Sequence, residues 1–81
     1  MTAKYIEELI NSNREIEFDY RGKRYSITCY KDNRTDYISF CEFYKTPHDV
    51  SSVKDLMNLE INGVKLSKIL SALPDSAFDI F

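Results

Sequence analysis

Residues 15–27 read EIEFDYRGKRYSI, and this stretch decides the fold. Acidic and apolar side chains alternate strictly over residues 15–20, which is the pattern of a half-buried β-strand. The dipeptide Arg21-Gly22 follows, and a glycine supplies the positive φ that a two-residue hairpin turn requires. The sequence therefore predicts an antiparallel hairpin that turns at Gly22.

The pairing across this hairpin follows from the turn, because a turn at residues 21–22 fixes which residues lie opposite one another. The expected pairs are Asp19 with Arg24, Phe18 with Tyr25, and Ile16 with Ile27. Polar residues then face polar ones and apolar residues face apolar ones, as favourable cross-strand pairs require. We therefore expect one buried face and one polar face on this hairpin.

A third strand is expected over residues 37–44, after a polar loop at residues 31–36. Pairing Tyr30 with Tyr37 keeps the apolar residues of both strands on the buried face. The same register places Glu42 on that apolar face, and a bulge around Cys41 or Glu42 is the alternative that would re-aim the end of the strand.

Outside these strands the apolar residues recur at helical spacing. Helices are expected over residues 3–11, from a cap at residue 51 or 52 to near residue 58, and over residues 66–73. Thr2 is placed to cap the first helix, and either Ser51 or Ser52 caps the second. Pro74 ends the third helix, because proline cannot continue the backbone hydrogen-bond pattern.

These elements predict a two-layer α+β domain that spans residues 1–81. It has an N-terminal helix, a three-stranded antiparallel meander and two C-terminal helices packed on one sheet face. Residues 46–49 are expected to form a loop, since Pro47 cannot extend a ladder of hydrogen bonds. The apolar residues 78–81 either add a short edge strand or dock on the core.

The composition is typical of a folded domain, with 43% hydrophobic and 30% charged residues. The formal net charge of -2 argues against a protein whose main work is to neutralise phosphates. We see neither a signal segment nor a long apolar span, and so expect a cytoplasmic protein without a membrane partner. Cys29 and Cys41 lack metal-ligand spacing and are expected to be buried free thiols.

Residues for catalysis are few. Cys41, His48 and Asp49 supply a thiol, a base and a carboxylate, which is the combination that thiolate chemistry needs. No family signature surrounds them, and a lone histidine in a proline-containing loop is usually an exposed polar residue. The two glycines stand apart and open no phosphate-binding loop. We therefore expect a protein that is not an enzyme and that has no metal or cofactor.

Binding to another protein is the favoured function, by a monomer or a homodimer. The candidate contact residues are Tyr30, Tyr37, Phe43, Arg21 and Arg24. The three aromatic residues fall on the outer sheet face, and aromatic residues are enriched in protein interfaces. The two arginines lie at the hairpin end. The competing interpretation is that the tyrosines simply cover the sheet.

Nucleic-acid binding is the alternative function. Small modules hold single strands by stacking bases on aromatic residues of a sheet that is flanked by basic groups. Sheet tyrosines and the basic hairpin end fit this description, but the acidic residues at positions 15, 17 and 19 would repel a phosphate chain.

Three runs of the sequence resemble known proteins, namely EIEFDYRGKRYSI, CEFYK and INGVKLSKIL. They are similar to runs in small uncharacterised proteins of Gram-positive bacterial genomes, prophages and other mobile elements. The likeness covers residues 15–70, and with no established activity in that group it carries no functional residue over. It implies a setting in which small accessory proteins bind a host or rival protein and alter its activity.

Overall fold

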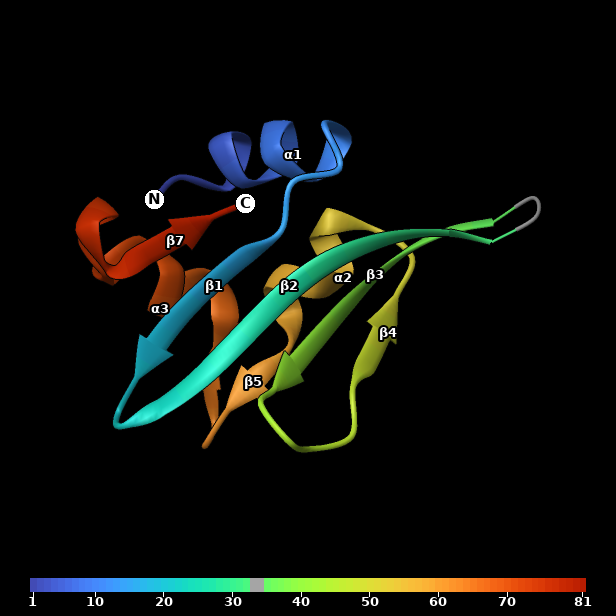
Figure 1. Ribbon diagram of the computed structural model, residues 1–81. Coiled ribbons are helices and arrows are strands. Elements are labelled where there is room, and N and C mark those ends of the chain that lie inside the picture. Colours follow the sequence, from blue (N-terminus) through green and yellow to red (C-terminus); the bar gives the residue numbers. More distant parts are fainter. Residues whose placement is uncertain (33–34) are drawn as a thin grey trace.

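The computed structural model describes residues 1–32 and 35–81. Figure 1 shows a twisted sheet crossed by the long strand β2 (Lys23–Asp32), with helices behind and above it. The predicted loop at residues 31–36 lies partly outside the described residues. Its described ends instead continue the flanking strands, because the backbone pairing extends to Asp32 and Thr35.

The main sheet has five antiparallel strands in the order β4-β3-β2-β1-β7. The strands other than β2 are β1 (Ile16–Tyr20), β3 (Thr35–Glu42), β4 (His48–Val50) and β7 (Phe78–Ile80). The predicted three-stranded meander forms the middle of this sheet, and one further short strand pairs at each edge. A second, two-stranded sheet consists of β5 (Glu60–Ile61) and β6 (Val64–Lys65).

Both predicted registers are confirmed. β1 and β2 turn at Gly22, whose φ is +78°, and Phe18 lies opposite Tyr25. β2 and β3 pair Tyr30 with Tyr37, and the register runs without interruption to the pair of Tyr25 and Glu42. The alternative of a bulge around Glu42 is therefore wrong.

The edges of the predicted meander need correction. The third strand ends at Glu42 rather than at Tyr44, whose φ of +67° takes the chain out of the extended conformation. Residues 48 and 49 of the expected loop belong to β4, which pairs with β3. Pro47 directly precedes this strand, where its missing N–H costs no ladder bond. The C-terminal apolar segment forms the edge strand β7 rather than a docked tail.

The three predicted helices are present. They are α1 (Ala3–Asn11), α2 (Val53–Asn58) and α3 (Leu66–Ala72). The Oγ1 atom of Thr2 accepts a hydrogen bond from the backbone N–H of Tyr5. The Oγ of Ser52 accepts one from the backbone N–H of Asp55 at 3.1 Å, so Ser52 rather than Ser51 is the cap of α2. A 3₁₀ turn, η1 (Asp75–Ala77), follows Pro74 and leads into β7.

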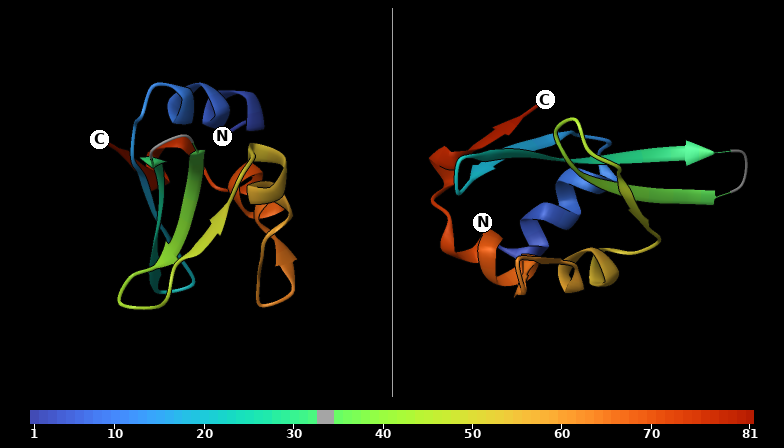
Figure 2. Two further views of the ribbon diagram at one scale, coloured as in Figure 1. Left: turned by 90° about the vertical axis from the view of Figure 1, so that its right-hand side faces the viewer. Right: turned by 90° about the horizontal axis from the view of Figure 1, so that it is seen from below.

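All three helices lie on the same side of the sheet, which the two views in Figure 2 show clearly. Their apolar side chains and those of the inner sheet face form one continuous core. Phe18 is at its centre, fully buried, with its ring stacked on Tyr25 and Phe40 and in contact with Phe78. Within the described part of the chain, no helix is long and apolar enough to cross a membrane.

Candidate functional site: the outer sheet face

The side of the sheet that faces away from the helices is covered by none of the described elements (Figure 2). Side chains alternate between the two faces along each strand, so the residues next to the core positions belong to this side. We call the outer sheet face the surface formed by Glu17, Asp19, Arg24, Ser26, Thr28, Tyr30, Tyr37, Ser39, Cys41, Phe43, Asp49 and Asp79.

The centre of the outer sheet face consists of small residues on β2 and β3. Ser26 lies opposite Cys41, and Thr28 lies opposite Ser39. Ser39 is only 6% exposed although no helix covers it. Its short side chain projects less from the sheet than the longer side chains at the two ends of the face, so the centre of the face is recessed. We call these four residues the central floor.

A pair of tyrosines borders one end of the central floor. Tyr30 and Tyr37 lie opposite each other, with ring centroids 5.4 Å apart and planes inclined by 22°. Tyr30 is 48% exposed, whereas Tyr37 is half-buried. The pair lies near the end of the β2–β3 hairpin, which projects beyond the helices (Figures 1 and 2). The stacked rings therefore form an accessible aromatic surface.

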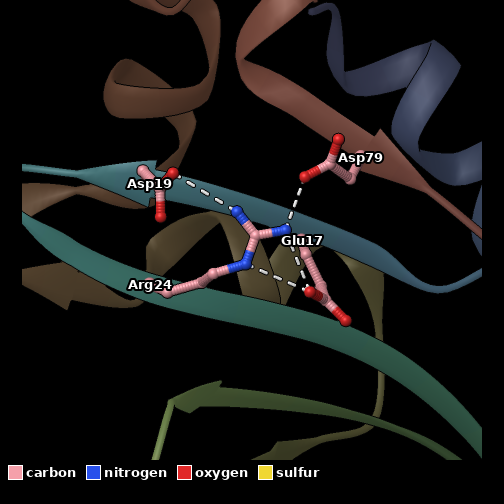
Figure 3. A network of polar contacts seen from close by, with 4 residues as sticks. All are labelled: Glu17, Asp19, Arg24 and Asp79. Carbon is pink, nitrogen blue, oxygen red and sulfur yellow. Dashed lines mark hydrogen bonds and ion pairs between the residues drawn. The ribbon is translucent and has the colours of Figure 1, made fainter.

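Arg24 borders the other end and is held by three carboxylates (Figure 3). Its Nε and Nη2 donate to Oε1 of Glu17 at 3.1 and 3.0 Å, and its Nη1 donates to Asp19 at 3.3 Å. Nη2 also donates to Asp79, which comes from β7 across the width of β1. The hydrogen bonds to Asp79 and Glu17 raise the pKa of Arg24 above its ordinary value. This guanidinium is therefore fully engaged within the chain, and three acids against one base leave the group negative.

The remaining candidate residues lie near Arg24. The ring of Phe43 is 5.9 Å from the Arg24 guanidinium carbon, in a cation–π arrangement. Arg21 lies in the turn itself, where its guanidinium carbon is 5.5 Å from the ring centroid of Tyr20. Arg24 and Tyr30 are six residue steps apart along β2, which is a distance of about 20 Å. The structure thus divides the five predicted contact residues into a tyrosine pair and an arginine end, rather than bringing them together.

The outer sheet face is acidic, which sequence reasoning missed in part. Asp49 on β4 and Asp79 on β7 add to Glu17 and Asp19, against Arg24 as the one base among its residues. Both additional acids lie on short edge strands, in segments that the sequence predicts to be a loop or else either an edge strand or a docked tail. The signal for β7 was its alternation of Phe78, Asp79 and Ile80, which is a short strand pattern.

The thiol, base and carboxylate considered for catalysis are not brought together. Cys41 is on the outer sheet face, where its Sγ lies 3.0 and 3.2 Å from the carbonyl oxygens of Glu42 and Lys45. His48 lies opposite Phe40, a core residue, and so points to the inner side of the sheet. Asp49 faces outward again. Among the described residues, no group of three or more histidine, cysteine or acidic side chains is placed to hold a metal ion.

A cleft on the inner side gathers other ionisable groups. It has a volume of about 250 Å³ and is lined by Lys23, Tyr25, Glu42, His48 and Glu60, among others. Glu42 fits on the apolar face because Tyr25 donates a hydrogen bond to it at 3.4 Å and Lys23 lies 3.5 Å away. Burial, and then the charge of Glu42, raise the pKa of Tyr25. This volume is below the range of most sites that enclose a small-molecule ligand.

The two cysteines are free, as expected, but neither is fully buried. Cys41 is half-buried on the open face. Cys29 lies on the inner side of the β2–β3 hairpin, where it lines a second small cleft with the end of α1 and the start of α2. The prediction of buried thiols is wrong, because Cys29 borders an open cleft and Cys41 is on the sheet face that points away from the helices.

No protein family matches the sequence, and neither a curated protein nor a solved structure matches it significantly.

Proposed function

We propose that this protein is a small, non-enzymatic binding factor that presents its outer sheet face to a partner protein. The observation that carries the proposal is the open sheet face bordered by the stacked pair of Tyr30 and Tyr37. Binding acts by steric occlusion, in which the sheet covers a functional surface of the partner. The setting proposed from the sequence resemblance is a mobile element, with the protein as an inhibitor or counter-defence factor.

The physical properties of the outer sheet face support binding to a protein. An exposed tyrosine offers a large contact area at a low cost in conformational entropy, because it has few rotatable bonds, and its hydroxyl group can donate or accept a hydrogen bond. The low central floor lets partner side chains approach the sheet closely. The Arg24 group also holds β1, β2 and β7 together, so the surface is preformed and little ordering opposes association.

A second candidate function is binding of single-stranded nucleic acid, which the exposed ring of Tyr30 favours because bases stack on such rings. The charges oppose it. Arg24 is engaged by Glu17, Asp19 and Asp79, and acidic side chains outnumber basic ones among the described residues that form the outer sheet face. A nucleic-acid binder would lose affinity steeply with added salt and on replacement of Arg21 or Arg24.

Site-specific photo-crosslinking tests the proposal. A photoreactive amino acid replaces Thr28 in the central floor, and a matched variant carries it at Lys68, an exposed residue of α3 in the helix layer. We expect crosslinking at position 28 to a discrete protein in cells of the encoding organism, and its loss in a Tyr30→Ser, Tyr37→Ser background. Crosslinking at position 68 alone, crosslinking to nucleic acid, or no crosslink from either position would contradict the proposal.

A further inference from the structure

We infer that the partner segment that lies across the outer sheet face is basic and carries arginines spaced to reach both edges of the sheet. This inference rests on the proposed function and names the chemistry of the partner. It follows from three observations, which are the charge of the face, the way this face already holds one arginine, and the distance between its acidic borders.

The acidic groups lie on both sides of the central floor. Asp49 projects from β4 on one side, and Glu17 and Asp79 project from β1 and β7 on the other. Asp49 is exposed and forms no hydrogen bond or ion pair with any residue that the structure describes. The carboxylates that hold Arg24 still outnumber it by three to one. A partner that supplies cations at both borders therefore gains on each side, and an acidic or phosphate-rich partner is repelled.

Arg24 shows how the face holds a guanidinium. The group lies between three carboxylates and 5.9 Å from the aromatic ring of Phe43, so it combines ion pairs with a cation–π contact. The other end of the face offers a similar pair of components. Tyr30 supplies an exposed ring, and Asp49 lies diagonally across from Tyr37 on the neighbouring strand. Asp49 and Tyr37 are diagonal neighbours on adjacent strands, about 7–8 Å apart, and Tyr30 stacks on Tyr37 from one strand further away. A long arginine side chain can therefore lie over the tyrosine pair and approach Asp49.

The width of the sheet sets the spacing. Four strand intervals separate β4 from β7, which is about 19 Å at roughly 4.8 Å for each interval. An extended segment covers this distance in about six residues. The small residues of the central floor allow such a segment to cross the strands without a clash. The partner segment is thus expected to place arginines about five or six residues apart, with uncharged residues between them.

Fluorescence anisotropy with synthetic peptides tests this inference on the full chain. One peptide carries two arginine pairs separated by four serines, and a second has the same composition with all four arginines adjacent. A third peptide replaces the arginines of the first with glutamates, and a single-stranded oligonucleotide of similar length serves as the nucleic-acid probe. We expect the spaced arginine peptide to bind most tightly, and its affinity to fall as salt is added.

Two pairs of variants locate the binding. The double variant Asp49→Asn, Asp79→Asn removes one carboxylate from each border, and Glu7→Gln, Glu8→Gln makes the same change in charge on exposed positions of α1. We expect the first to weaken binding of the spaced peptide about tenfold, or roughly threefold for each exposed ion pair, and the second to leave it unchanged. Far-ultraviolet circular dichroism of each variant checks that the fold is retained.

The outcomes separate this inference from the proposed function. Equal binding of the two arginine peptides, equal weakening in both double variants, or preference for the oligonucleotide would overturn the basic-segment inference. If position 28 crosslinks to a partner while the spaced peptide does not bind, the protein-binding function stands and the basic chemistry of the partner is wrong. If the peptide binds as expected but no protein crosslinks, the function fails and the face is only an acidic surface.

Discussion

Replacing Tyr30 with serine is expected to remove partner contact at a much smaller cost in stability than the loss of a buried aromatic ring. A fully buried tyrosine removes about 150–250 Å² from water, and Tyr30 keeps 48% of its surface exposed. About 100 Å² is therefore shielded, which stabilises the fold by at most roughly 2.5 kcal/mol. Because the serine retains the Cβ atom and the unfolded chain already shields part of the ring, we expect a loss of about 1–2 kcal/mol.

The matched control is Phe40→Ala, on the inner face of β3. Phe40 is buried and stacks on Tyr25 with ring centroids 5.6 Å apart, so its removal is expected to cost about 3–5 kcal/mol. Such a loss is comparable to the whole stability of many small domains. Urea unfolding followed by circular dichroism gives both values. If Tyr30→Ser destabilises the protein as much as Phe40→Ala does, Tyr30 is a core residue and the outer sheet face is not a free contact surface.

Three further predictions concern the fold. Burial and the charge of Glu42 raise the pKa of Tyr25 above its ordinary 10.0, so the folded state keeps a proton that the unfolded chain loses at high pH. The free energy of unfolding should therefore fall as the pH rises above about 10. Tyr25→Phe should remove part of this fall, which urea titrations at alkaline pH would measure. Gly22→Ala should lower the free energy of unfolding by about 1–2 kcal/mol in thermal or urea unfolding, because φ is +78° there. The space around Gly22 is open, so the cost comes from the backbone conformation and not from a clash, and Gly22→Asn should cost less. Ser52→Ala should lower the unfolding free energy by about 1 kcal/mol and Ser51→Ala hardly at all; the reverse order would refute the cap assignment.

The centre of the sheet was predictable because local chemistry and long-range pairing agree there. The turn at Gly22 and the alternation before it fix one register, and the apolar residues of β3 fix the next. The edge strands β4 and β7 could not be predicted with the same certainty from the sequence. β4 has three residues, preceded by a proline and containing a histidine and an aspartate, so only its pairing with β3 makes it a strand. The strand pattern of β7 is equally short, and nothing near it in the sequence identifies β1 as its partner.

The sequence predicts the aromatic residues of the candidate site but not the full set of charged residues around Arg24. The stacking of Tyr30 on Tyr37 follows from the register alone, since opposite residues share a face. The role of Arg24 does not. Pairing with Asp19 was expected from the hairpin, but the hydrogen bond to Asp79 joins residues from β2 and β7, far apart in the chain. The sequence predicts that Arg24 contacts a partner, and it does not indicate this third carboxylate, which binds Arg24 within the chain.

The late position of β7 in the chain has a consequence for biosynthesis. β1 leaves the ribosome early, but its neighbour on one side is made only after α3. Until then the nascent chain has an unpaired strand edge, and Phe18 lacks the ring of Phe78. Exposed strand edges of this kind recruit other chains. Translation that stalls between α3 and β7 should therefore yield aggregation-prone products, even though almost the entire hydrophobic core has already been synthesised.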